Sequence, residues 1–101
     1  MRKLPKDIID EMKARFNSDF DSANKILTEY IAQNEYLNSD RIIRCIVYLA
    51  DNGIESFKSY LDCAKGDPRD VMYWAECDGD FKNHNVKQIR DFNKTFEEND
   101  I

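Results

Sequence analysis

A chain of 101 residues, of which 42% are hydrophobic and 35% charged, has the length and apolar content of one compact domain. Its three glycines and two prolines exclude a collagen-like or linker-like chain, and a net charge of -5 opposes non-specific binding to nucleic acid or to anionic membranes. No apolar run reaches the roughly 18 residues of a membrane span, and the charged start differs from a secretory signal. We expect a single soluble, cytoplasmic domain over residues 1–101.

Two amphipathic helices are predicted in the first third of the chain. Apolar residues recur at helical spacing from Pro5, which suits a first helical turn, to Phe16. The pair Ser18 and Asp21 then has the spacing of a capping box, and a second helix is expected to start there. Its apolar stripe consists of Phe20, Ala23, Leu27, Tyr30 and Ile31.

A third helix is predicted near residues 40–51 and is expected to lie at the centre of the fold. The stretch from Ile42 to Ala50 is apolar except for a few polar residues, which fall on one helical line. The many β-branched residues also permit a buried strand, but strand periodicity would scatter that polar line. The residues Asn52 and Gly53 tolerate the left-handed conformation that often ends a helix.

Two further helices follow, and the second of them has the clearest start signal in the chain. A fourth helix, antiparallel to the third, is predicted from the stripe formed by Ile54, Phe57, Leu61 and Ala64. Asp67 and Pro68 combine an N-cap residue with a proline suited to the first turn of a fifth helix. In that helix Val71, Trp74 and Ala75 are expected to face inward, and the sequence Asp-Gly-Asp at 78–80 is expected to end it.

A sixth helix is predicted to close the domain. After an irregular connection over residues 81–85, Asn85 and Gln88 offer a weak capping box, followed by apolar residues at helical spacing. Those apolar residues are Val86, Ile89, Phe92 and Phe96. The predicted fold is therefore an all-α domain of five or six short helices in an orthogonal or bundle-like arrangement.

No catalytic, metal or cofactor signature is recognisable. The three cysteines and the single His84 lack the close pairs typical of structural zinc sites, and the segment that begins at Asp78 lacks the glycine and the closing glutamate of a calcium loop. The chain contains neither a phosphate-binding glycine loop nor a dinucleotide fingerprint. We therefore expect no metal, no cofactor and no nucleic-acid partner.

Two polar lines supply the candidate binding residues. The line on the third helix ends at Asp51 and the line on the fifth ends at Asp80. The candidate patch consists of Arg41, Arg44, Tyr48, Arg69, Tyr73 and Glu76. Arginine and tyrosine are enriched at binding hot spots, and the arginines would hold carboxylates of a partner or of the chain itself. The alternative is that both lines are only the solvent-exposed edges of helices that pack in the core.

The sequence favours a non-enzymatic, acidic protein-interaction module. An immunity protein, an antitoxin-like inhibitor or a small regulatory subunit would use such a chain to cover a basic partner surface, and a homodimer is a further alternative. The competing hypothesis is a small enzyme or ligand-binding domain with its site around Cys77, His84 and Trp74, in which a thiol next to a base becomes reactive.

Overall fold

The computed structural model describes residues 3–80 and 85–101, and this part of the chain is mostly helical. Five α-helices follow one another: α1 (Lys6–Phe16), α2 (Phe20–Gln33), α3 (Asp40–Leu49), α4 (Ile54–Gly66) and α5 (Pro68–Glu76). Two short strands come next, β1 (Cys77–Asp80) and β2 (Asn85–Gln88). Short 3-10 turns lie at Asn17–Asp19, Glu35–Leu37 and Glu97–Asn99. The all-α prediction is thus correct in outline, and the strand pair was not foreseen.

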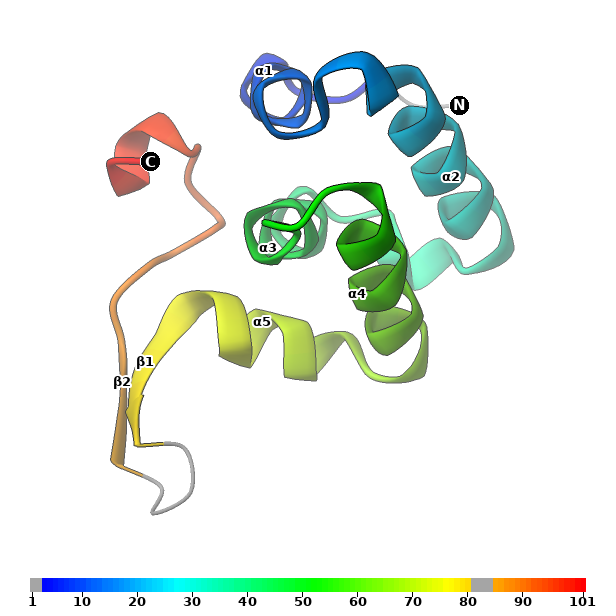
Figure 1. The fold of residues 1–101 in the computed structure, drawn as a ribbon. Coiled ribbons are helices and arrows are strands. Elements are labelled where there is room, and N and C mark those ends of the chain that lie inside the picture. Colours follow the sequence, from blue (N-terminus) through cyan, green and yellow to red (C-terminus); the bar gives the residue numbers. More distant parts are fainter. Residues whose placement is uncertain (1–2, 81–84) are drawn as a thin grey trace.

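The helix α3 lies between α1, α4 and α5 (Figure 1). Its N-terminus is capped by Ser39, whose Oγ accepts a hydrogen bond of 3.4 Å from the backbone N–H of Ile42. The consecutive residues from Ile43 to Val47 are all buried, so the helix is covered on most of its circumference. One of these buried residues is an arginine, Arg44, whose charge requires a partner of opposite sign inside the fold.

The helices α1 and α2 form as the apolar stripes predicted, but α2 begins differently. Residues 17–19 form a 3-10 turn, and no side chain caps α2 at Asp19. The predicted capping box at Ser18 is therefore not formed. The apolar stripe of α2 is formed as predicted, because Ala23, Leu27 and Ile31 are buried in the core.

The start of α5 is confirmed. The Oδ1 atom of Asp67 accepts a 3.0 Å hydrogen bond from the backbone N–H of Arg69, and Pro68 is the first helical residue. The predicted inward face needs a correction, however. Val71 and Ala75 are buried, whereas Trp74 is 42% exposed, because α5 packs on α3 and α4 along one side only.

The predicted sixth helix is wrong. Residues 85–88 form β2, which pairs antiparallel with β1 so that Asp78 lies opposite Lys87. Residues 89–101, which we call the C-terminal segment, contain a single 3-10 turn and no α-helix. The backbone N–H groups of Ile89 and Arg90 both donate to the carbonyl of Glu76, which directs the chain along α5 instead of into a new helix. Of the irregular connection expected over residues 81–85, residues 81–84 lie outside the described residues, and Asn85 begins β2.

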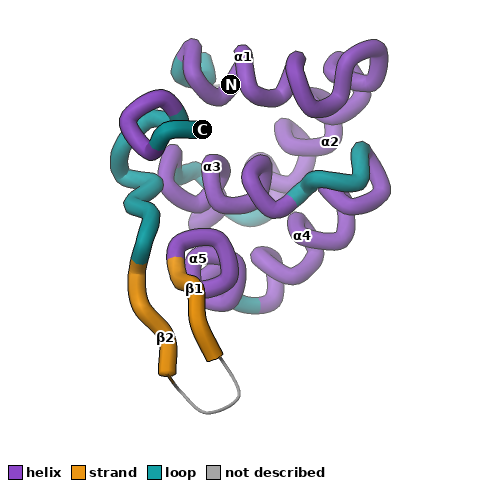
Figure 2. Tube along the Cα trace, turned by 60° about the vertical axis from the view of Figure 1, so that its left-hand side comes forward, coloured by secondary structure: helices purple, strands orange, loops and turns teal. Residues whose placement is uncertain are grey.

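The C-terminal segment runs from the strand pair past α5 and α3 toward α1 (Figures 1 and 2). Its two phenylalanines, Phe92 and Phe96, are buried together with the apolar faces of the five helices in one hydrophobic cluster. The radius of gyration of 13.1 Å agrees with the value of about 13 Å for a compact chain of this length. Among the described residues, no helix has the length and apolar character needed to span a bilayer.

Candidate functional site

The candidate residue Arg44 forms a buried ion pair with Asp7 of α1. Its Nε and Nη2 atoms donate to the two carboxylate oxygens at 2.8 and 3.0 Å, and its Nη1 atom donates to the carbonyl of Phe92 at 3.1 Å. The two side chains are only 7% and 8% exposed. A bidentate pair of this kind is directional, so it fixes the position of α1 against α3.

The charged form of Asp7 is favoured inside the fold. Burial alone would raise the pKa of its carboxyl, but the hydrogen bonds from Arg44 and from the backbone N–H of Phe96 outweigh that effect, and the pKa lies below its usual range. The same contact raises the pKa of the Arg44 guanidinium. The pair therefore remains ionised at neutral pH.

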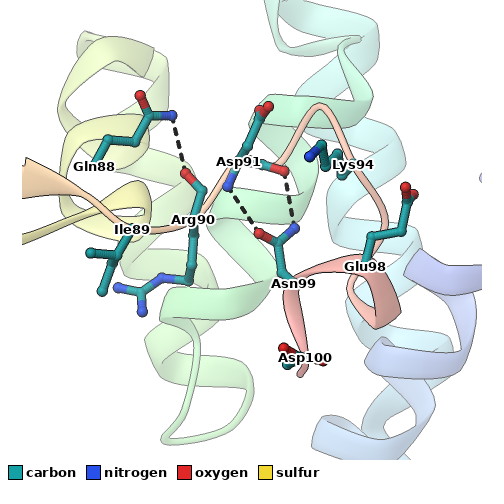
Figure 3. A pocket seen from close by; sticks show the side chains of 8 residues that line it. All are labelled: Gln88, Ile89, Arg90, Asp91, Lys94, Glu98, Asn99 and Asp100. Carbon is teal, nitrogen blue, oxygen red and sulfur yellow. Dashed lines mark hydrogen bonds between the residues drawn. The ribbon is translucent and has the colours of Figure 1, made fainter.

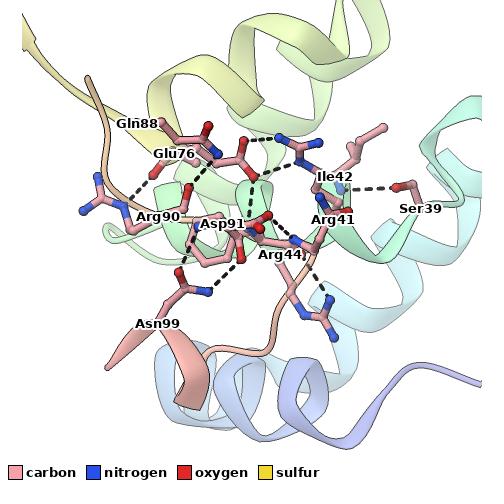
Figure 4. Close-up of polar contacts among 12 residues, drawn as sticks. Ser39, Arg41, Ile42, Arg44, Glu76, Gln88, Arg90, Asp91 and Asn99 are labelled. Atoms are coloured by element: carbon pink, nitrogen blue, oxygen red, sulfur yellow. Dashed lines mark hydrogen bonds and ion pairs between the residues drawn. The ribbon is translucent and has the colours of Figure 1, made fainter. Parts of the chain in front are cut away.

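The candidate residues Arg41 and Glu76 form a second pair, between α3 and α5 (Figure 4). The guanidinium of Arg41 donates from Nε to Oε2 at 2.8 Å and from Nη2 to Oε1 at 2.5 Å. Glu76 is 3% exposed, and its Oε2 atom also accepts a 3.0 Å hydrogen bond from the backbone N–H of Phe92. Glu76 therefore contacts other parts of its own chain and has almost no surface to offer a partner.

The half-buried Tyr48 lies under the C-terminal segment. Its ring packs against that of Phe92, with centroids 5.3 Å apart. The guanidinium carbons of Arg15 and Arg90 lie 5.6 and 4.7 Å from the ring centroid, within the range of a cation–π contact. Asp51, at the end of the predicted polar line, is exposed in the turn after α3.

The polar line of α5 is divided between surface and interior. Arg69, Asp70, Tyr73 and Trp74 are exposed along one side of the helix, which we call the α5 face. Arg69 pairs with the capping residue Asp67 at 3.0 Å. The ring of Trp74 stands edge-on to that of Tyr60 from α4, with centroids 6.4 Å apart. Glu76 faces the opposite way, into the fold, and the side chain of Asp80 is not described.

The residues of the competing enzyme hypothesis are only partly described. Cys77 is half-buried at the start of β1, whereas His84 lies outside the described residues. Cys45 is buried in α3, and burial raises the pKa of its thiol far above its usual range, which makes it a poor nucleophile. Within residues 3–80 and 85–101, no cluster of three potential ligands could hold a metal ion.

Two depressions on the described surface are open and polar. One, with a volume of about 470 Å³, lies beside the C-terminal segment and is lined by residues such as Arg90, Lys94 and Glu98 (Figure 3). Asn99 also lines this depression, and its side-chain amide is already hydrogen-bonded to the backbone of Asp91. A second, of about 410 Å³, lies next to Ser39 and Arg41. Small-molecule sites are usually enclosed and mostly apolar, so neither depression favours a ligand-binding function.

Sequence reasoning missed Asp7, the partner of Arg44. The two residues are separated by 37 positions, and an acid in the first turn of a helix has a sufficient local explanation in the helix dipole. The usable signal is Arg44 itself, because an arginine within the most apolar run of a chain requires a buried carboxylate nearby.

Comparison of the chain with protein-family models, with curated proteins and with solved structures found no match.

Proposed function

We propose that this chain is a non-enzymatic protein-interaction module that contacts its partner through the α5 face. The supporting observation is Trp74, the single tryptophan of the chain, which is 42% exposed on a regular helix. Tyr73 beside it is 38% exposed. Aromatic side chains held on a rigid element lose little entropy on binding, which makes them effective anchors.

The rest of the predicted patch has a different role in this proposal. Arg69 and Tyr73 belong to the contact surface, together with Asp70 and Trp74. Arg41, Arg44, Tyr48 and Glu76 hold α5 and the C-terminal segment in place, since each of them is engaged within the chain. The contact surface is thereby smaller than the predicted patch and lies on a single helix.

The proposed partner is a protein with a basic surface. The chain carries a net charge of -5, and Asp70 lies one helical turn from both Tyr73 and Trp74. A lysine or arginine of the partner could stack on the Trp74 ring and pair with the Asp70 carboxylate. An immunity protein, an antitoxin-like inhibitor or a small regulatory subunit would each use such a contact. The proposal places this action in the cytoplasm, where the three free thiols would stay reduced.

Site-specific photo-crosslinking in cells tests this proposal. A photoreactive phenylalanine analogue at position 73 is expected to capture one discrete basic protein, and Trp74→Ala in the same chain is expected to abolish that product. The matched control position is Tyr36, which is 51% exposed but lies between α2 and α3. The same product from both positions, or one that persists with Trp74→Ala, would contradict the α5 face as the contact. A crosslink between two copies of the chain would assign the face to a homodimer instead.

A further inference from the structure

The C-terminal segment is held by its backbone as much as by its side chains. The backbone N–H of Phe92 donates to Glu76 of α5 at 3.0 Å, and its carbonyl accepts from Arg44 of α3 at 3.1 Å. The backbone N–H of Phe96 donates to Asp7 of α1 at 3.2 Å. Side chains from three helices thus recognise main-chain groups, which every peptide carries.

Two aromatic rings supply the side-chain part of the contact. Phe92 is fully buried and Phe96 is 2% exposed, and the centroids of their rings lie 5.5 Å apart. The ring of Phe92 also packs on Tyr48 of α3. The spacing of four residues between the phenylalanines therefore determines which segments fit here, whereas the residues between them include the exposed Asn93 and Lys94.

The receiving side chains are paired even without the segment. The carboxylate of Asp7 keeps two hydrogen bonds from Arg44, and that of Glu76 keeps two from Arg41. Withdrawing the segment consequently leaves no buried carboxylate without a cation, which would be the costly outcome. The helices that the segment covers also contact one another directly, α1 with α3 and α3 with α5.

The segment also has internal bonds that keep its shape. The Nδ2 atom of Asn99 donates to the carbonyl of Asp91 at 3.0 Å, and the backbone N–H of Asp91 donates to the Oδ1 atom of Asn99 at 2.9 Å (Figures 3 and 4). These bonds close a loop around the two phenylalanines. The segment therefore has internal contacts of its own besides its contacts to the helices.

We propose that Asp7, Arg44, Tyr48 and Glu76 form a peptide-docking surface that the chain covers with its own C-terminal segment. The occupant that replaces the segment is a stretch of a partner protein that folds into a similar turn and carries two aromatic side chains four residues apart. The covering segment shows the chemistry that fits, and the contacts to its backbone are independent of sequence. This surface is separate from the α5 face, so the inference does not depend on the proposed function.

Binding of a peptide in trans tests the inference on the full-length chain. The probe is a fluorescent peptide with the sequence of residues 89–101, and the protein carries Phe92→Ala and Phe96→Ala, which weaken the covering segment. Anisotropy should show saturable binding at least about tenfold tighter than to the wild type, whose surface is occupied. The same peptide with alanine at both phenylalanine positions should bind at least about tenfold more weakly.

The matched control is the protein with Asn93→Ala and Lys94→Ala, two exposed side chains of the same segment. It should bind the peptide as weakly as the wild type does. The inference is overturned if the folded double phenylalanine variant does not bind the peptide, or binds the alanine peptide equally well. A wild-type dimer that the free peptide converts to monomer would assign the surface to a second copy of the chain and would also overturn the partner assignment.

If the double phenylalanine variant does not fold, hydrogen exchange of the wild type tests whether the C-terminal segment opens locally. The backbone N–H groups of Phe92 and Phe96 should exchange through a local opening that is faster than exchange in α3 and insensitive to low denaturant concentrations. Both groups could instead exchange at the same rate as the amides of Ile46 and Val47 in α3, with the same denaturant dependence. The segment would then open only on global unfolding. That result would overturn the inference.

Discussion

At the scale of single residues, Arg44 shows why a polar line on a helix is ambiguous. The line from Arg41 to Tyr48 has the composition of a binding hot spot, yet its members pair with Glu76, Asp7 and the ring of Phe92. An arginine can serve either purpose, because the same planar donor group suits a partner's carboxylate or an internal one. The deciding quantity is burial, and Arg44 is only 6% exposed.

Removal of the Arg44 charge should therefore destabilise the folded state. We expect Arg44→Leu to lower the free energy of unfolding by about 3–5 kcal/mol, because it leaves the carboxylate of Asp7 buried without its cation. The matched control, Arg69→Leu, removes an arginine from an exposed pair with Asp67 and should leave stability unchanged within experimental error. Urea unfolding followed by circular dichroism measures both. Equal, small losses for the two variants would contradict the internal role of Arg44.

The pH dependence of stability should carry the signature of Asp7. Because folding lowers the pKa of this carboxyl from its ordinary value of 3.8, the unfolded chain binds the proton more readily. The stabilisation by Asp7 is therefore complete above pH 3.8 and is lost as the pH falls through the lower pKa of the folded state. Urea unfolding of the wild type and of Asp7→Asn should give a difference at pH 6 that shrinks by pH 3. A difference that stays constant between these pH values would refute this assignment.

At the scale of elements, the sequence was informative where local signals and packing agree. The start of α5 could be predicted because Asp67 and Pro68 act on the first turn itself. The C-terminal segment could not, because Phe92 and Phe96 are buried by packing on other helices, and a spacing of four residues does not require a helix. Trp74 was misplaced for a related reason, since helical periodicity cannot tell which flank of an apolar stripe lies at the molecular edge.

The turn between α3 and α4 permits a matched test with two glycines. Gly53 has φ of +83° and ψ of -158°, a conformation that side chains strongly disfavour, whereas Gly66 lies at the end of α4. An added Cβ would meet no atom within 4 Å at either position. Gly53→Ala should therefore cost about 1–3 kcal/mol through backbone strain alone. Gly66→Ala should be neutral or stabilise by up to about 1 kcal/mol in urea unfolding. A similar effect of the two substitutions would contradict the geometry of this turn.

At the scale of the whole molecule, the two ends of the chain are connected through its central helix. Asp7 near the start and Phe92 near the end both bind Arg44, and Asp7 also accepts the backbone N–H of Phe96. Contacts over such sequence distances leave no local pattern, so they could not be predicted from the sequence. The helix α5 takes part in this internal network through Glu76, which pairs with Arg41. The α5 face lies on the exposed side of the same helix.

Backbone hydrogen exchange tests whether the chain binds its partner through the α5 face. The protein is compared alone and in complex with the partner identified by crosslinking from position 73. We expect the added protection to be strongest over residues 69–76 and the indole N–H of Trp74 to be protected as well. Added protection that is confined to α1 and α2, with residues 69–76 unchanged, would contradict binding through the α5 face.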